Sequence, residues 1–229
     1  MRILDHSVFI FGAIIFALFS VSCGTVKTET NANANRPLVL PNRNVEKPKI
    51  IAFGDSLTAG FGVAEKESYP YLLQQRLNSE GYDYEVVNAG VSGDTSLGGA
   101  ERSDWVLNRD DAKILILALG SNDLLRGMPV DKMKENLRKI LEKAKAKKMK
   151  ILICGMLAPS SVGVEYQRDF INTFTELSKE YKTELLPFML TGVALDKRLN
   201  QADGIHPNAE GTKIMADNIY QKLKPLLEK

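Results

Sequence analysis

The sequence predicts an α/β domain in which five parallel strands form a sheet with helices on both faces. Short apolar runs alternate with longer amphipathic segments, and the third apolar run, over 113–119, contains almost no polar residue after its first position. A strand without a polar face is typical of a parallel sheet covered on both sides. The alternation of strand and helix favours the crossover connections that such a sheet requires.

The predicted strands are short runs rich in apolar and β-branched residues, at Lys49–Phe53, Tyr84–Asn88, Lys113–Leu119, Lys150–Cys154 and Thr183–Leu186. The predicted helices have apolar residues spaced three or four apart, at Tyr69–Leu77, Ser96–Leu107, Val130–Lys147, Tyr166–Tyr181 and Asn208–Leu227. Gly81 closes the first helix, and Asn208 is a candidate N-cap of the last.

Three segments of different composition divide the 229 residues. Residues 1–22 carry Arg2 before an apolar run over 8–21, which is short for a membrane span and suits a secretory signal peptide. Residues 23–48 are polar, small and proline-bearing, so we expect a flexible tether. Residues 49–229 are long enough for one well-buried domain.

The two cysteines, Cys23 and Cys154, lie in very different surroundings. The sequence Ser22-Cys23-Gly24 resembles the cleavage site of a bacterial lipoprotein, in which the cysteine is lipidated, although Ser20 stands where leucine is usual. An ordinary cleaved signal is the alternative. Cys154 ends a predicted buried strand, where a lone cysteine packs as a small hydrophobe, so we expect no structural disulfide.

The formal net charge of +2 gives no reason to expect a nucleic-acid partner. The mature chain has a single histidine, His206, because His6 lies in the predicted signal. A serine hydrolase working near neutral pH needs a base such as histidine. Asp203, three residues earlier, can turn back to orient the imidazole. Alone, this segment could equally be a surface loop with an incidental histidine.

Ser56 is the candidate nucleophile, because Gly54-Asp55-Ser56-Leu57 directly follows the first predicted strand. Ligands of open parallel sheets bind beyond the carboxyl ends of the strands. The G-x-S-x-G elbow of α/β-hydrolases is absent from the chain. Two further strand ends carry candidate oxyanion donors: the backbone N–H of Gly93 and the side-chain amide of Asn122, which would act with the backbone N–H of Ser56.

Taken together, Gly54-Asp55-Ser56-Leu57, the Gly93 loop, Gly120-Ser121-Asn122-Asp123 and Asp203-Gly204-Ile205-His206-Pro207 resemble the four blocks of the SGNH/GDSL hydrolases. The likeness is greatest to the arylesterase, acyl-CoA thioesterase and lysophospholipase branch. It implies a flavodoxin-like three-layer α/β/α fold and a catalytic triad of Ser56, His206 and Asp203. It also implies an oxyanion hole of Ser56, Gly93 and Asn122, with no metal and no cofactor.

The resemblance implies a serine esterase that acts on small acyl esters, thioesters or lipids. Export favours ester substrates, because little acyl-CoA is met outside the cytoplasm, and we expect the enzyme in the cell envelope or periplasm, anchored through Cys23. Two alternatives stay open: an acetyl esterase acting on sugars or cell-wall polymers, and a non-catalytic binding domain of the same fold. The natural substrate, the acyl-chain length and the oligomeric state are not predicted.

Overall fold

The computed structural model describes residues 47–229 of the chain. The predicted signal segment, Cys23 and nearly all of the predicted tether lie outside the described residues. None of the helices within 47–229 is long and apolar enough to cross a membrane.

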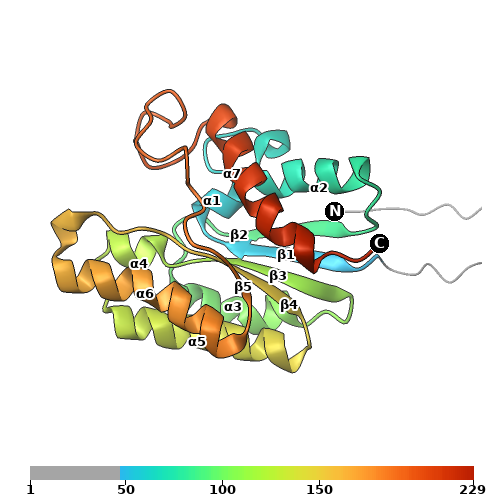
Figure 1. The fold of residues 1–229 in the computed structure, drawn as a ribbon, viewed down its shortest axis with the longest axis horizontal. Coiled ribbons are helices and arrows are strands. Elements are labelled where there is room, and N and C mark those ends of the chain that lie inside the picture. The colour runs from blue at the N-terminus through green and yellow to red at the C-terminus, as the bar shows by residue number, and fades with distance from the viewer. Residues whose placement is uncertain (1–46) are drawn as a thin grey trace, which may run out of the picture. The chain divides into compact units, whose positions relative to one another are not determined.

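The described residues form a sheet of five parallel strands (Figure 1). The strands are β1 (Lys49–Gly54), β2 (Glu85–Gly90), β3 (Ala112–Ala118), β4 (Lys150–Cys154) and β5 (Glu184–Leu186). Their order across the sheet is β2-β1-β3-β4-β5, so the chain moves outward from β1 to β2 and then crosses back to β3. The predicted fold class is confirmed. The strand order changes direction between β1 and β3, where sheets of this kind open a crevice.

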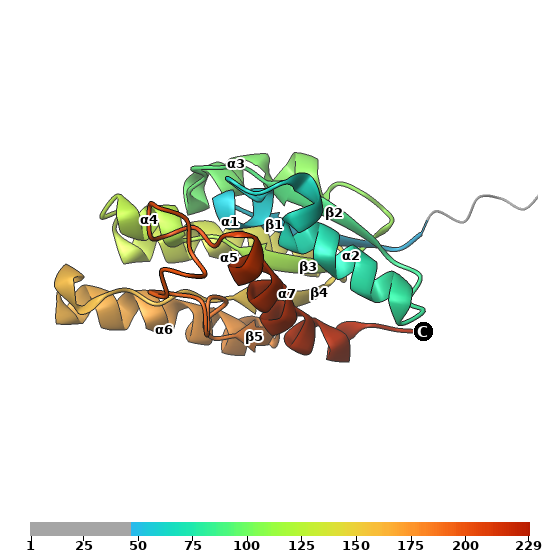
Figure 2. The same cartoon turned by 90° about the horizontal axis from the view of Figure 1, so that it is seen from above.

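Helices cover both faces of the sheet (Figures 1 and 2). On one face lie α2 (Tyr69–Ser79) and α7 (Ala209–Leu223); on the other lie α3 (Ser96–Leu107), α5 (Val130–Ala146) and α6 (Val164–Tyr181). The residues of β1 from Ile50 to Phe53 are all apolar, because alternate side chains enter opposite cores. Ile50 and Ala52 pack under α2 and α7, and Ile51 and Phe53 pack under the other three helices.

The structure adds two short helices that the sequence did not predict, α1 (Ser56–Ala59) and α4 (Ser121–Leu125). The predicted last helix is shorter than expected, because α7 ends at Leu223 and a 3-10 turn follows over Lys224–Leu226. Pro225 has no backbone N–H and therefore cannot extend the α-helical hydrogen bonding. The remaining helices and strands match their predicted ranges to within two residues at each end.

Asn208 is the N-cap of α7, as predicted. Its side-chain oxygen accepts hydrogen bonds from the backbone N–H groups of Glu210 and Gly211, each at 3.1 Å. This cap fixes where the last helix begins, and with it the end of the loop that carries His206.

Candidate active site

Ser56 is the first residue of α1 and is separated by one residue from the end of β1, an inner strand of the sheet. The preceding residue, Asp55, caps this short helix: its Oδ1 accepts a hydrogen bond from the backbone N–H of Leu57 at 3.1 Å. An aspartate at this position satisfies one of the free N–H groups of the first turn. The cap therefore sets the chain turn that carries Ser56.

Two glycines allow α1 to lie directly against the strand ends. A Cβ atom on Gly54 would lie 2.0 Å from the Thr58 hydroxyl oxygen, and one on Gly90 would lie 2.2 Å from the backbone nitrogen of Ala59. Neither position can accept a side chain without moving the helix. The close approach holds the first residue of α1 at the carboxyl edge of the sheet.

The structure brings Ser56, His206 and Asp203 into one hydrogen-bonded chain. Ser56 Oγ lies 2.8 Å from His206 Nε2, and His206 Nδ1 lies 2.7 Å from Asp203 Oδ2. The second carboxylate oxygen of Asp203 accepts the backbone N–H groups of Ile205 at 3.0 Å and His206 at 3.1 Å. The carboxylate is thereby fixed in orientation from both sides, and the imidazole ring is oriented toward the serine.

The loop over 187–208 carries His206 from the end of β5 to the start of α7. Gln201 stabilises this loop: its backbone N–H donates to the carbonyl of His206 at 2.8 Å, and its side-chain amide donates to the carbonyls of Phe61 at 2.7 Å and Pro207 at 2.9 Å. The Phe61 ring also lies 4.8 Å from the imidazole, centroid to centroid. The segment after α1 and the His206 loop therefore support each other.

The pKa values of two carboxyl groups at the site are shifted in opposite directions. The hydrogen bond from the His206 side chain, helped by two backbone N–H groups, lowers the pKa of Asp203 to about 2. Burial raises the pKa of Asp55 to about 6, against the opposing effect of the Leu57 N–H. Asp203 therefore remains an anion across the neutral range, as an acceptor for an imidazolium must.

Cys154 has the properties of a packing residue. It is fully buried on β4, and burial raises the pKa of its thiol to about 12. A thiol that stays protonated is a poor nucleophile. Cys154 therefore does not compete with Ser56 as the nucleophile.

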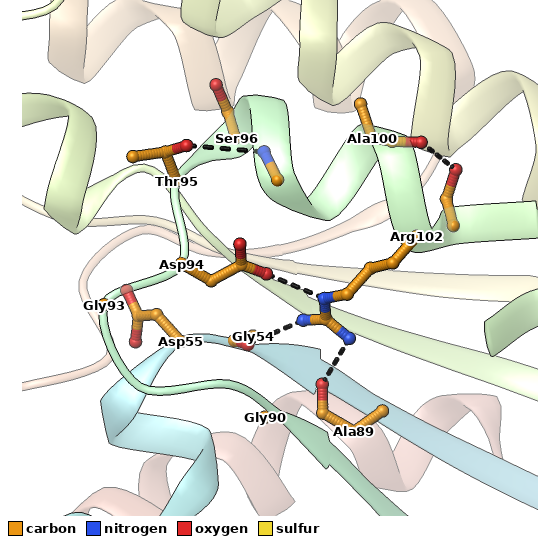
Figure 3. A network of polar contacts seen from close by, with 12 residues as sticks. Gly54, Asp55, Ala89, Gly90, Gly93, Asp94, Thr95, Ser96, Ala100 and Arg102 are labelled. Carbon is orange, nitrogen blue, oxygen red and sulfur yellow. Dashed lines mark hydrogen bonds and ion pairs between the residues drawn. The ribbon is translucent and has the colours of Figure 1, made fainter. Parts of the chain in front are cut away.

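Gly93 and Asn122 both lie at the carboxyl edge of the sheet beside this arrangement. Gly93 is on the loop between β2 and α3, with a φ of +80° that favours glycine, and Figure 3 shows this loop passing next to Asp55. Asn122 is in α4, after β3. Its amide nitrogen donates to the carbonyl of Asp94 at 2.9 Å and lies 3.4 Å from Asp55 Oδ2. The amide is therefore tied to both the Gly93 loop and the turn that carries Ser56.

Three charged residues at this edge have contacts that the sequence did not predict: Asp55, Asp123 and Arg102. Asp123 is buried and accepts hydrogen bonds from the backbone N–H of Ser96 at 2.8 Å and its hydroxyl at 2.6 Å. The available signal for the two aspartates was their position directly beside Ser56 and Asn122. The signal for Arg102 was weaker, because the sequence shows only a charged residue beside the buried face of a predicted helix.

The arrangement is suited to nucleophilic attack on a carbonyl carbon. A hydroxyl is within hydrogen-bonding distance of an imidazole nitrogen, and the imidazole is oriented by a carboxylate. Within residues 47–229, no group of three or more His, Cys, Asp or Glu side chains is arranged to hold a metal ion.

Comparison with known proteins relates the chain to acyl hydrolases. Residues 52–214 match the model of the GDSL-like Lipase/Acylhydrolase family. The chain is 38% identical to Esterase TesA of Pseudomonas aeruginosa over 190 residues, which span 83% of this chain and 94% of that relative. It is 33% identical to Thioesterase 1/protease 1/lysophospholipase L1 of Escherichia coli K12, over 83% of this chain and 90% of that one.

Solved structures show the same likeness in three dimensions. The crystal structure of TesA superposes with a TM-score of 0.75 at 38% identity, covering 78% of this chain and 99% of that one. The esterase EstA from Pseudoalteromonas sp., in a structure inhibited by monoethylphosphonate, gives a TM-score of 0.74 at 31% identity, covering 78% and 98%.

Proposed function

The chain belongs to the GDSL-like lipase/acylhydrolase family, and we propose that it hydrolyses acyl esters or thioesters with Ser56 as the nucleophile. The observation that carries this proposal is the continuous chain of hydrogen bonds from Ser56 through His206 to Asp203. A serine hydroxyl is a weak nucleophile until a neighbouring base takes its proton, and this chain supplies the base and its orienting carboxylate.

The reaction proceeds in two acyl-transfer steps. His206 Nε2 takes the proton from Ser56 Oγ while Oγ forms a bond to the acyl carbon, and the imidazolium is stabilised by Asp203. The tetrahedral intermediate collapses, the bond to the leaving oxygen or sulfur breaks, and His206 returns the proton to the departing alcohol or thiol. His206 then deprotonates a water that attacks the acyl-enzyme, which releases the acid and restores the Ser56 hydroxyl.

The negative oxygen of each tetrahedral intermediate needs hydrogen-bond donors. The proposed donors are the backbone N–H groups of Ser56 and Gly93 and the side-chain amide of Asn122. The 2.9 Å bond from Asn122 to the Asp94 carbonyl uses one hydrogen of this amide and holds the group in place. The contact to Asp55 is long at 3.4 Å, so the second hydrogen is only weakly bound and is available to an oxyanion.

We propose acyl chains longer than acetate as substrates. Large apolar side chains are exposed on the segments that follow the strands and on the His206 loop: Phe61, Leu125, Leu157, Val162 and Ile205. Leu125 is directly followed by Arg126, whose guanidinium donates to the Gly93 carbonyl at 2.7 Å, so this leucine belongs to the same edge of the sheet as the site. An apolar chain bound there would cover side chains that now face water.

A panel of nitrophenyl esters from acetate to dodecanoate tests the function and the substrate class together. We expect kcat/KM to rise from acetate toward medium chains, and Leu125→Ser to lower it for octanoate by about fivefold while changing acetate little. Trp105→Ser is the matched control: this 84% exposed residue lies in the last turn of α3, away from the helix end that faces the site. Activity confined to acetate would favour the alternative of a sugar or cell-wall acetyl esterase.

We further propose that the enzyme acts in the cell envelope or periplasm, tethered through residues 23–48 after removal of 1–22. The support is the charged, apolar and small-residue pattern that ends at Cys23. Cells that express the full chain with a clickable fatty acid should label the wild type and Cys154→Ser, whose thiol is buried, but not Cys23→Ser. An unlabelled wild type, or a labelled Cys23→Ser, would exclude lipidation at this residue.

A further inference from the structure

Arg102 connects three separate segments of the chain at the carboxyl edge of the sheet (Figure 3). Its Nε donates to Asp94 Oδ2 at 2.7 Å, Nη1 to the carbonyl of Ala89 at 2.9 Å, and Nη2 to the carbonyl of Gly54 at 3.0 Å. The guanidinium also lies over the Phe53 ring, 4.1 Å from its centroid. Every nitrogen of this planar group is therefore used, in the fixed geometry that distinguishes arginine from lysine.

The three acceptors belong to parts of the site that must keep fixed positions relative to one another. Gly54 ends β1 and precedes Asp55 and Ser56, and Ala89 lies at the end of β2. Asp94 directly follows Gly93 and is also bonded, through its carbonyl, to the Asn122 amide. A single side chain thus joins the strand before the nucleophile to the loop that carries Gly93, one of the proposed oxyanion donors.

The ion pair is poorly exposed on both sides, with 19% of the Arg102 side chain and 11% of the Asp94 side chain accessible. Removing two charges from water is costly, and apolar packing of α3 on the sheet would stabilise the domain at least as well. The charged network fixes the positions of the joined segments more closely than apolar packing does, because each hydrogen bond restricts both distance and direction.

We propose that Arg102 is a positioning residue for acyl transfer, which fixes the Gly93 loop relative to the turn that carries Ser56. This inference rests on the function proposed above, because that function assigns the backbone N–H of Gly93 to the oxyanion. Arg102 makes no hydrogen bond to Ser56 or His206. It acts through Asp94 and through the carbonyls of Gly54 and Ala89. Donors preorganised on two segments stabilise the transition state only while the segments keep their spacing.

The direct test is Arg102→Gln, assayed on a short nitrophenyl ester. We expect kcat to fall by about 10–100-fold with KM within about twofold, because the lost interaction is made in the transition state rather than in substrate binding. Arg102→Lys should recover only part of the loss, since the donors of an ammonium are all on one nitrogen and cannot reach acceptors that bond three different nitrogens of the guanidinium. An unchanged kcat in folded Arg102→Gln would overturn the inference, and so would a large rise in KM at constant kcat.

Arg76→Gln is the matched control. Arg76 lies 3.9 Å over the Tyr220 ring and pairs with Glu80 and Asp217, so its removal deletes the same kind of stacked, ion-paired guanidinium. It joins α2 to α7 rather than to the site. We expect this variant to lose stability without a change in kcat. Equal losses of kcat in the two arginine variants would mean that Arg102 has only a structural role.

A second variant keeps the test decisive if Arg102→Gln does not fold. Gly98 is on α3, and a Cβ there would lie 2.1 Å from Asp94 Oδ1, so Gly98→Ala must shift the carboxylate whose other oxygen, Oδ2, accepts the Arg102 Nε–H. Alanine is a better helix former than glycine, so the melting temperature should be retained while kcat falls. Wild-type kcat in Gly98→Ala would overturn the inference. Undiminished activity of Ser56→Ala would instead refute the proposed function itself.

Discussion

Replacement of Ser56 by alanine should reduce esterase turnover by about 10⁴–10⁶-fold and leave the fold intact. The variant removes the only oxygen in the proposed triad that can form the acyl-enzyme, so water must attack without a covalent step. The Ser56 hydroxyl is bonded to His206, whereas the α1 cap depends on the Asp55 side chain and the Leu57 N–H, which the substitution leaves in place. Turnover of nitrophenyl butyrate and thermal unfolding measure the two effects.

A phosphonate ester provides an independent readout for the same variant. The wild type should gain the mass of one phosphonyl group, while Ser56→Ala should gain none. Ser79→Ala is a matched control, because Ser79 is an exposed serine at the end of α2 whose hydroxyl donates only to the Arg76 carbonyl. This control should keep both activity and labelling. Labelling of Ser56→Ala at another serine would show that the nucleophile lies elsewhere.

The fold was predictable because burial on two faces removes polar residues from parallel strands. The third strand, β3, has both of its faces packed under helices and reads as an apolar run, so its sequence alone identified it. The short helices α1 and α4 have four and five residues, which is too few for a helical period to be seen. The Asp55 cap and the close approach to Gly54 and Gly90 hold α1 in place. The α4 helix has no side-chain cap and is tied to its neighbours by the hydrogen bonds of Asn122 and Asp123.

The candidate site was predictable to the extent that its residues follow strands. Ser56, Gly93 and Asn122 each come soon after a parallel strand, and such ends meet at one edge of the sheet. The contribution of Arg102 was not predictable in this way. Its acceptors Gly54 and Ala89 are backbone carbonyls, which carry no signal in the sequence, and the pairing with Asp94 depends on how α3 packs.

The His206 loop shows how a local feature of the sequence and a distant contact combine. The three-residue spacing from Asp203 to His206 allows the carboxylate to accept both the ring N–H and the backbone N–H of the same residue. The distance to Ser56, 150 residues earlier, is set by the strand order and by the hydrogen bond from Gln201 to Phe61. Because the pKa of Asp203 is held at about 2, its charge is constant wherever the enzyme is folded and active near neutral pH.

Conversion of Asp203 to asparagine should lower kcat by roughly 10³–10⁴-fold while the loop keeps its shape. The asparagine carbonyl oxygen can still accept the backbone N–H groups of Ile205 and His206, as Oδ1 of Asp203 does. Its amide nitrogen would then donate to His206 Nδ1, which places the ring proton on Nε2. An imidazole in this tautomer cannot take the Ser56 proton, and it also loses the anion that stabilises its charged form.

The matched control for this variant is Asp196→Asn in the same loop. Asp196 pairs with Arg198 at 2.7 Å, and that bond lowers the pKa of Asp196 to about 2, as His206 does for Asp203. It is a carboxylate of similar pKa that makes no bond to the imidazole, so its loss should leave kcat close to the wild-type value. If Asp203→Asn kept more than a tenth of wild-type turnover, the carboxylate would not control the tautomer. His206 would then have to be oriented by the packing of its ring on Phe61 and by Gln201, which bonds its carbonyl but not its ring.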